Sequence, residues 1–177
     1  LPILPRDAFR TNSVVGTGLW VVLLINIAGA GSAVYLVLVV QQMWGYGPAT
    51  AGALAAALAI TWSFSSVTVA NVRSKETRKT LIRFGPCFIG GGLLLVLAGL
   101  EFDQVAIVIV GQMIIGAGFG MHNSYLNLTM MEAASDTERD RASALIPTTQ
   151  SAGNAIGAAV AGVAANSAGL AAAASAG

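Results

Sequence analysis

Long runs of apolar residues alternate along this chain with short polar segments. Charged side chains are absent from Thr11 to Val72, from Phe84 to Leu100 and from Gln104 to Met131, and a further uncharged run follows Arg141. A helix that crosses about 30 Å of hydrocarbon takes about 20 mostly apolar residues. Because continuous apolar runs satisfy their backbone groups in lipid as helices, the pattern predicts five transmembrane helices, at about Val14–Val40, Thr50–Val72, Leu81–Leu100, Gln104–Met131 and Ala142–Asn166.

The composition favours the bilayer over water as the solvent of most of this surface. Of 177 residues, 55% are hydrophobic and only 10% are charged, whereas soluble domains carry about a quarter charged residues. A soluble protein with buried helices is the alternative, but five helices that are apolar all round would leave too little polar surface. We therefore expect an all-α integral membrane protein. A net charge of +1 gives no reason to expect nucleic acid binding.

The basic residues indicate an orientation in the membrane. Five of the nine Lys and Arg residues lie in Asn71–Arg83, which we call the basic segment. If the five predicted helices alternate in direction, all nine basic residues lie on one face, and Glu101 and Asp103 lie on the other. Cytoplasmic loops are enriched in Lys and Arg, so we expect the first residue in the cytoplasm and the last outside, in the cell (inner) membrane. Contact with lipid headgroups alone would also explain the basic segment.

The predicted organisation is a cytoplasmic segment at 1–13, a five-span bundle at 14–166 and a truncated extracytoplasmic loop at 167–177. The chain lacks an initiating Met and ends in an Ala-rich run, so we expect a fragment. Its partners would then be membrane lipid, a missing N-terminal transmembrane bundle and a missing final helix.

The fourth predicted helix carries a polar stripe. At 100° per residue, Gln112, Asn123 and Asn127 fall within roughly 80° of arc, together with Gly116 and Phe119. Such a stripe faces other helices or an aqueous cavity rather than lipid. Two interpretations stay open, namely hydrogen bonds between helices and contact with a transported substrate.

Further polar candidates lie on the other predicted helices. Gln150 and Asn154 share one face of the fifth helix, Asn26 lies within the first, and Trp62 lies in the middle of the second with an indole N–H that needs a partner. His122 lies at the border of the stripe. It is either a hydrogen-bonded structural residue or a candidate proton relay.

Two pairs of glycines are spaced for close helix packing. Gly116 and Gly120, and likewise Gly153 and Gly157, stand four residues apart. Small residues at this spacing let helix backbones approach closely in lipid. We therefore expect both pairs at helix interfaces.

Enzymatic and metal chemistry find no support in the sequence. The single Cys and single His do not form a metal-binding cluster, and no phosphate-binding loop or catalytic triad is present, so we expect neither a metal nor another cofactor. Every Asp and Glu falls in a connection or at the edge of a predicted span. Intramembrane carboxylates are the usual proton carriers of transporters, so this segment is not expected to supply one.

Three stretches, in this order and spacing, resemble the C-terminal half of a major facilitator superfamily transporter, most closely the fourteen-span multidrug drug:proton antiporters. They are Leu4-Pro-Arg-Asp-Ala-Phe-Arg10 with Val40-Gln-Gln-Met-Trp-Gly-Tyr-Gly-Pro48, then Gly116-Ala-Gly-Phe-Gly-Met121, and finally Asp140-Arg-Ala-Ser-Ala-Leu145 with Gln150-Ser-Ala-Gly-Asn-Ala-Ile-Gly-Ala-Ala159. The resemblance implies that the five helices form most of the C-terminal six-helix bundle. It also implies that Arg78 and Lys79 correspond to the basic pair of the superfamily's cytoplasmic loop motif.

The function that this resemblance implies is proton-coupled efflux of hydrophobic or cationic small molecules by alternating access. Small-molecule substrate and protons would then be further partners. The alternatives are a specific carrier of a sugar, peptide or organic acid from the same superfamily, and a membrane scaffold or sensor that does not transport.

Overall fold

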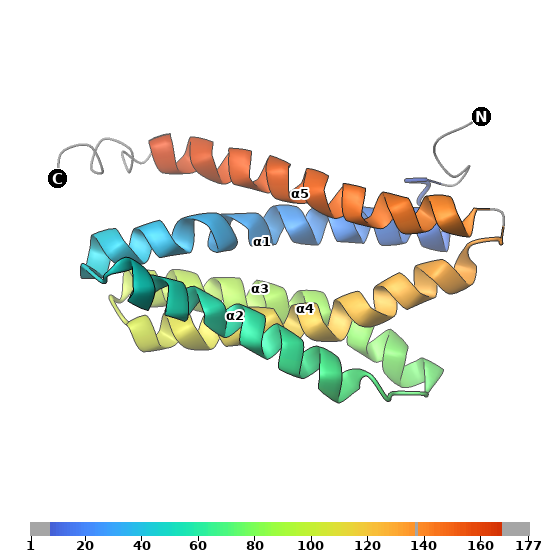
Figure 1. Ribbon diagram of the computed structural model, residues 1–177, viewed down its shortest axis with the longest axis horizontal. Coiled ribbons are helices and arrows are strands. Elements are labelled where there is room, and N and C mark those ends of the chain that lie inside the picture. Colours follow the sequence, from blue (N-terminus) through green and yellow to red (C-terminus); the bar gives the residue numbers. More distant parts are fainter. Residues whose placement is uncertain (1–7, 137, 168–177) are drawn as a thin grey trace. The chain divides into compact units, whose positions relative to one another are not determined.

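The computed structural model describes residues 8–136 and 138–167, which form five long helices and no strand (Figure 1). The helices are α1 (Val14–Trp44), α2 (Pro48–Val69), α3 (Lys75–Glu101), α4 (Val105–Ala133) and α5 (Arg139–Ser167). The predicted all-α fold is confirmed. Residues 1–7 of the predicted cytoplasmic segment and 168–177 of the predicted final loop lie outside the described residues.

The helices begin and end at other residues than the apolar pattern predicts. Helix α2 ends at Val69, and α3 already begins at Lys75, so most of the basic segment is helical rather than a loop. The N-cap Ser74 starts α3, since its side chain accepts a hydrogen bond from the backbone N–H of Thr77. Hydropathy marks where a chain enters hydrocarbon, whereas caps determine where the helix starts. At 27 residues, α3 is about 40 Å long and exceeds the hydrocarbon thickness.

Helix α1 has a well-defined cap at each end. The Ser13 hydroxyl accepts a hydrogen bond from the Gly16 N–H at 2.9 Å. At the other end Gly45 adopts the left-handed conformation, with φ 64°, and its N–H donates to the Gln41 carbonyl. Only glycine adopts this conformation without steric cost, which explains the glycine directly after the aromatic end of α1.

Four of the five helices, α1 to α4, are long and apolar enough to cross a membrane. Helix α5 begins with the charged residues Arg139, Asp140 and Arg141 and continues mainly with Ala, Gly and polar residues. Its length of 29 residues would suffice to span the hydrocarbon. A crossing by α5 therefore stays a prediction.

The chain divides into two compact units, each described here by itself. The first unit comprises α1, α5 and the end of α4 from Met130 onward. Within it α1 and α5 run parallel and side by side (Figure 1), because successive positions pair in the same order along both helices. A Cβ atom added at Gly153 would lie 2.8 Å from the Asn26 Cβ, and one added at Gly31 would lie 3.3 Å from the Ala161 Cβ.

The second unit comprises α2, α3 and α4 up to Thr129. Helix α2 runs parallel to α4: Gly116 faces Leu58, and Gly120 faces Trp62 and Ser65. The Ser65 hydroxyl also donates to the Ala117 carbonyl at 3.1 Å. These two even-numbered helices therefore point the same way, as expected for a chain that crosses the membrane at every helix.

Helix α3 lies antiparallel to α4 in this unit, along a row of glycines. A Cβ atom added at Gly92 would lie 2.7 Å from the Gly111 carbonyl oxygen. One added at Gly118 would lie 2.8 Å from the Gly85 carbonyl oxygen. At Gly99 the added atom would lie 2.8 Å from the Val108 backbone nitrogen. The two backbones are so close that no side chain fits between them.

Candidate functional site

The amides of the polar stripe on α4 differ in burial. Gln112 is buried, and Asn123 and Asn127 are half-buried. Phe119, on the same face, is also buried. In a helix these positions follow one another along one side. Helix α4 therefore presents a strip in which Gln112 comes first, the Phe119 ring second, and Asn123 and Asn127 last.

Helix α2 brings Trp62 onto this strip. The indole ring stacks on Phe119, with ring centroids 5.5 Å apart and an interplanar angle of 29°. Gly116 and Gly120 permit this contact, because a Cβ atom at Gly120 would lie 2.6 Å from the Trp62 carbonyl. Trp62 stays 39% exposed, so the pair offers an aromatic surface beside the amides.

Asn127 carries an acceptor that no described group satisfies. Its Oδ1 atom is buried and has no hydrogen-bond partner among the described residues. A buried polar atom without a partner costs about 1–3 kcal/mol. Such an atom is suited to accept a hydrogen bond from a ligand or a water molecule, and it is the sharpest chemical feature of the strip.

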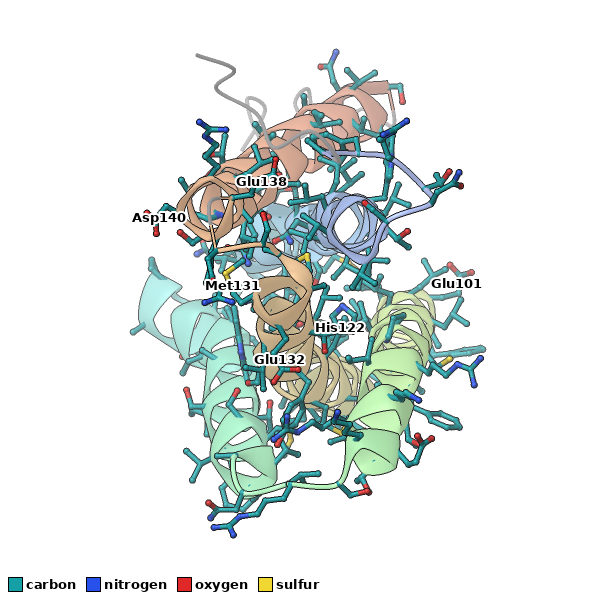
Figure 2. All side chains as sticks on the ribbon, turned by 90° about the vertical axis from the view of Figure 1, so that its right-hand side faces the viewer. Glu101, His122, Met131, Glu132, Glu138 and Asp140 are labelled. Carbon is teal, nitrogen blue, oxygen red and sulfur yellow. The ribbon has the colours of Figure 1, made fainter. Side chains whose placement is uncertain are left out.

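His122 belongs to a different side of α4. Its ring lies between α4 and α3 (Figure 2), where Nδ1 is 3.0 Å from the carbonyl oxygen of Ile82. The side chain is only 1% exposed, and Nε2 has no partner among the described residues. The structure therefore separates His122 from the amide strip and gives it a backbone partner on α3.

The polar candidates of the first unit are less enclosed. Asn26 is half-buried beside Gly153, and its amide donates to the Val22 carbonyl of its own helix at 2.8 Å. Gln150 is half-buried and Asn154 is exposed. The structure thus brings Asn26 to the α1–α5 interface, while Gln150 is partly accessible and Asn154 is exposed. Whether these residues share a cavity with the α4 strip stays a prediction.

The four glycines predicted for helix packing lie at two interfaces. Gly116 and Gly120 face α2, and Gly153 and Gly157 face α1. A Cβ atom at Gly157 would lie 2.8 Å from the Ala30 Cβ, and one at Gly153 would lie 2.7 Å from the Leu23 carbonyl. Their contribution to helix association stays a prediction.

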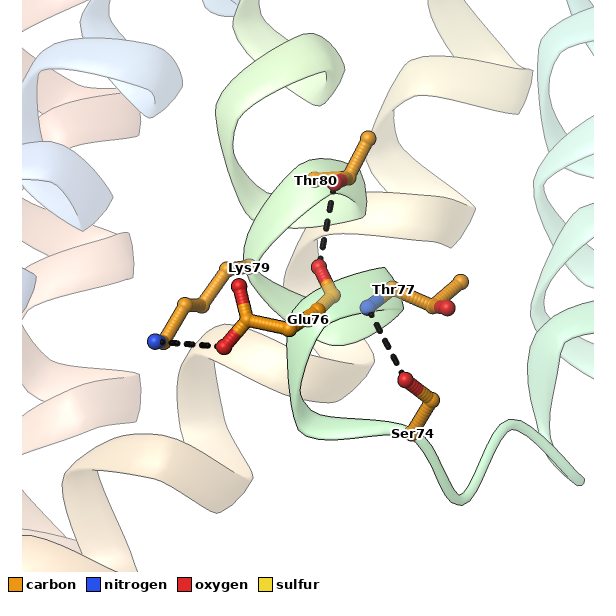
Figure 3. Close-up of polar contacts among 5 residues, drawn as sticks. All are labelled: Ser74, Glu76, Thr77, Lys79 and Thr80. Atoms are coloured by element: carbon orange, nitrogen blue, oxygen red, sulfur yellow. Dashed lines mark hydrogen bonds and ion pairs between the residues drawn. The ribbon is translucent and has the colours of Figure 1, made fainter.

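The two basic residues matched to the loop motif lie in the first turns of α3. Lys79 forms an exposed ion pair with Glu76 at 2.9 Å (Figure 3), which stabilises little in water. The Arg78 Nε donates to the Val72 carbonyl at 2.9 Å, and its guanidinium lies 5.3 Å from the centroid of the Tyr125 ring. Arg78 therefore connects α3 to the end of α2 and to α4.

Sequence reasoning missed Tyr125. Its hydroxyl donates to the Val69 carbonyl and lies 3.4 Å from the Val72 carbonyl. The Val69 carbonyl ends α2 and also accepts a hydrogen bond from the Val72 N–H at 3.0 Å, and the Val72 carbonyl lies in the connection that follows. Tyr125 and Arg78 add side-chain donors to this turn. An aromatic residue with a polar tip near the C-terminal end of a predicted span was the available signal.

The acidic side chains in the described part of the chain lie at helix ends or in connections: Glu76, Glu101, Asp103, Glu132, Asp136, Glu138 and Asp140. Those residues include no group of three or more His, Cys, Asp or Glu that could hold a metal ion. A cavity of about 220 Å³ in the first unit is lined by Ser13, Ser135 and Glu138 among small residues. It lies beside the charged connection after α4, and none of the candidate amides is among the residues that line it.

These features define a class: a multi-pass helical membrane protein with small residues at its helix interfaces and an uncharged polar strip on one helix. The chain belongs to the Major Facilitator Superfamily, a superfamily of membrane transporters, whose family model matches residues 1–158. This confirms the resemblance seen in the sequence. The match includes residues of both units and ends within α5.

Similar proteins include probable multidrug-efflux transporters from two Mycobacterium tuberculosis strains, CDC 1551 / Oshkosh and H37Rv. Each is 30% identical to this chain over 165 residues. The match covers 88% of this chain and 35% of each relative, so the chain spans about a third of the length of these relatives. No solved structure gives a significant match.

Proposed function

We propose that this chain is part of a secondary transporter that exports hydrophobic or cationic small molecules in exchange for protons. Membership of the Major Facilitator Superfamily and the similarity to proteins described as probable multidrug-efflux transporters support this proposal. The two bundles of such a transporter rock around a site near the middle of the membrane. The first residue would be cytoplasmic and the last extracytoplasmic, in the cell membrane.

The observation that carries the proposal is the uncharged strip on α4. Its three amides, Gln112, Asn123 and Asn127, adjoin the aromatic pair of Trp62 and Phe119. Aromatic faces attract both apolar groups and cations, while neutral amides supply hydrogen bonds without selecting for a charge. An anionic substrate would need a fixed Arg or Lys at this depth, and the described Lys and Arg side chains lie elsewhere.

The protons would be carried by another part of the transporter. Proton carriers in membranes are Asp, Glu and His chains inside the bundle, whereas the acidic side chains described here are at helix ends. The proposed role of this segment is therefore to orient the substrate. An N-terminal bundle and one further helix would complete the fold around it.

The test is dye transport by the complete protein in inside-out vesicles, with and without a protonophore. We expect accumulation of a fluorescent cationic dye that the protonophore abolishes. Asn123→Ala and Asn127→Ala should each reduce uptake by up to about tenfold at unchanged protein level, because each removes one hydrogen bond to the substrate. Ser124→Ala is the matched control, since this exposed neighbour bonds only the Gly120 carbonyl of its own helix, at 3.3 Å.

Other results would redirect the assignment. Dye uptake by both asparagine variants at the level of the starting protein would remove the strip from the substrate path. Absence of dye transport by a protein correctly inserted in the membrane would favour the carrier of a specific metabolite, or a relative that does not transport.

A further inference from the structure

Pro86 lies inside α3 and leaves one backbone group without its usual partner. In an α-helix the carbonyl of residue 82 accepts a hydrogen bond from the N–H of residue 86, and proline has no N–H. The Ile82 carbonyl is therefore deprived of its donor. Ile82 is half-buried, and a backbone carbonyl that is covered and has no partner costs free energy, so a side-chain donor there is favourable.

His122 of α4 supplies the missing donor. Its Nδ1 lies 3.0 Å from the Ile82 carbonyl oxygen, and a carbonyl oxygen can only accept. Nδ1 must therefore carry a proton, and a neutral ring then has Nε2 as an acceptor. The contact joins residues 40 positions apart, so it ties α3 to α4 rather than stabilising α4 alone.

The glycines around Pro86 bring the ring into reach. Gly85 directly precedes the proline, and a Cβ atom there would collide with the Cβ of His122 and lie 3.2 Å from the Gly118 carbonyl. Because Gly85 and Gly118 carry no side chains, α4 approaches α3 closely at the turn that the proline interrupts. The Ile82 carbonyl, the His122 ring and the space that Gly85 leaves for this ring therefore occur at the same turn.

We propose that His122 is a positioning residue that replaces the backbone N–H which Pro86 lacks. It holds α3 against α4 as the neutral tautomer protonated at Nδ1, and it does not relay protons. This role goes beyond the proposed export activity, since it would hold whatever the protein transports.

A second proline in the chain provides a matched comparison. Pro147 lies inside α5 and deprives the Ser143 carbonyl in the same way. Ser143 is exposed and lies about one turn into α5, so water can reach its carbonyl. We therefore expect no dependence of this site on a side-chain donor.

The first test identifies the tautomer of His122 in the protein without substitutions. Nitrogen-15 NMR of the complete protein, labelled at histidine, would be assigned by difference from a His122→Gln sample. The expected spectrum shows a protonated Nδ1 and an unprotonated Nε2 for His122. A proton on Nε2 with Nδ1 free would overturn the proposal.

The second test is a double-mutant cycle on the complete protein in detergent. His122→Ala should lower the Tm by about 3 °C, the order expected for the loss of one hydrogen bond to a part-buried carbonyl. Pro86→Ala restores an N–H to the helix, so in that background His122→Ala should lower the Tm by less than half as much. In a Pro147→Ala background the full loss should remain, and His122→Gln, which keeps an N–H donor, should restore part of it.

The cycle has a clear contrary result. An equal loss of Tm on His122→Ala in the starting protein and in the Pro86→Ala background would show that His122 does not serve the carbonyl that the proline frees.

Discussion

The hydroxyl of Tyr125 joins α4 to the last carbonyl of α2, which also accepts the Val72 N–H. It donates to the Val69 carbonyl, while Arg78 serves the Val72 carbonyl and covers the tyrosine ring. The carbonyls at the C-terminus of a helix need such donors. Three helices of the second unit therefore meet at one residue.

Tyr125→Phe should destabilise the protein by about 1 kcal/mol, because it removes the hydroxyl contact to the Val69 carbonyl, leaves that carbonyl with the Val72 N–H alone, and keeps the ring beneath Arg78. Thermal unfolding in detergent measures the effect. Tyr46→Phe, which alters a half-buried tyrosine in the connection after α1, is the control and should change little. Equal stability of the two variants would argue against the hydroxyl contact.

At the scale of the element, the main feature is the glycine row between α3 and α4. Gly85, Gly92 and Gly99 on α3 are seven residues apart, as are Gly111 and Gly118 on α4. A seven-residue repeat keeps one helix face turned toward a partner. Packing of small residues is a principal source of helix association in lipid, where apolar side chains gain nothing by leaving the solvent.

Gly92→Ala should weaken the α3–α4 pair by about 1–3 kcal/mol, the usual cost of inserting a methyl group into a closed interface. The added Cβ would lie 2.6 Å from the Ile115 Cγ1 and 2.7 Å from the Gly111 carbonyl. Gly91→Ala is the matched control, since a Cβ there meets nothing within 4 Å. It should be neutral or stabilise α3 by up to about 1 kcal/mol.

Thermal unfolding of both variants in the same detergent decides the matter. The order of the two variants carries the result. A Gly91→Ala protein that is less stable than Gly92→Ala would mean that the row is not the packing face.

At the scale of the whole molecule, helix directions within each unit agree with a chain that reverses at every helix. Parallel partners are α1 with α5 and α2 with α4, and the antiparallel pair is α3 with α4. Two odd-numbered or two even-numbered helices point the same way, whereas an odd-numbered and an even-numbered helix point in opposite directions. This pattern supports the proposal that α5 also crosses the membrane.

Cysteine labelling would test the proposed topology in intact cells. In a Cys87→Ser background, Gly47→Cys and Asn166→Cys should react with a membrane-impermeant maleimide from outside. Gly47 lies in the connection after α1, and Asn166 lies in the last turn of α5. Asn71→Cys, in the basic segment between α2 and α3, should react only after the membrane is permeabilised. Labelling of Asn71→Cys from outside would reverse the orientation, and protection of Asn166→Cys in intact cells would argue against a crossing by α5.

The sequence by itself determined the number of helices, their approximate places and the superfamily. These follow from long apolar runs, from the confinement of charge to the connections and from motifs that are local in the chain. The ends of the helices were harder to predict from the sequence, because Ser74 starts α3 within a charged stretch that hydropathy alone assigns to a loop. The polar strip was also visible, since the 100° periodicity of a helix fixes which of its residues share a side.

Only the tertiary structure decided which partner each side meets. Helical periodicity places His122 beside the amide strip, but the α3–α4 packing directs it to the Ile82 carbonyl, 40 positions away. Tyr125 likewise bonds the Val69 carbonyl, 56 positions away in the sequence. The glycines of α3 contribute to packing because glycines of α4 lie opposite them. Such contacts depend on the relative rotation and approach of two helices, which short-range sequence patterns do not specify.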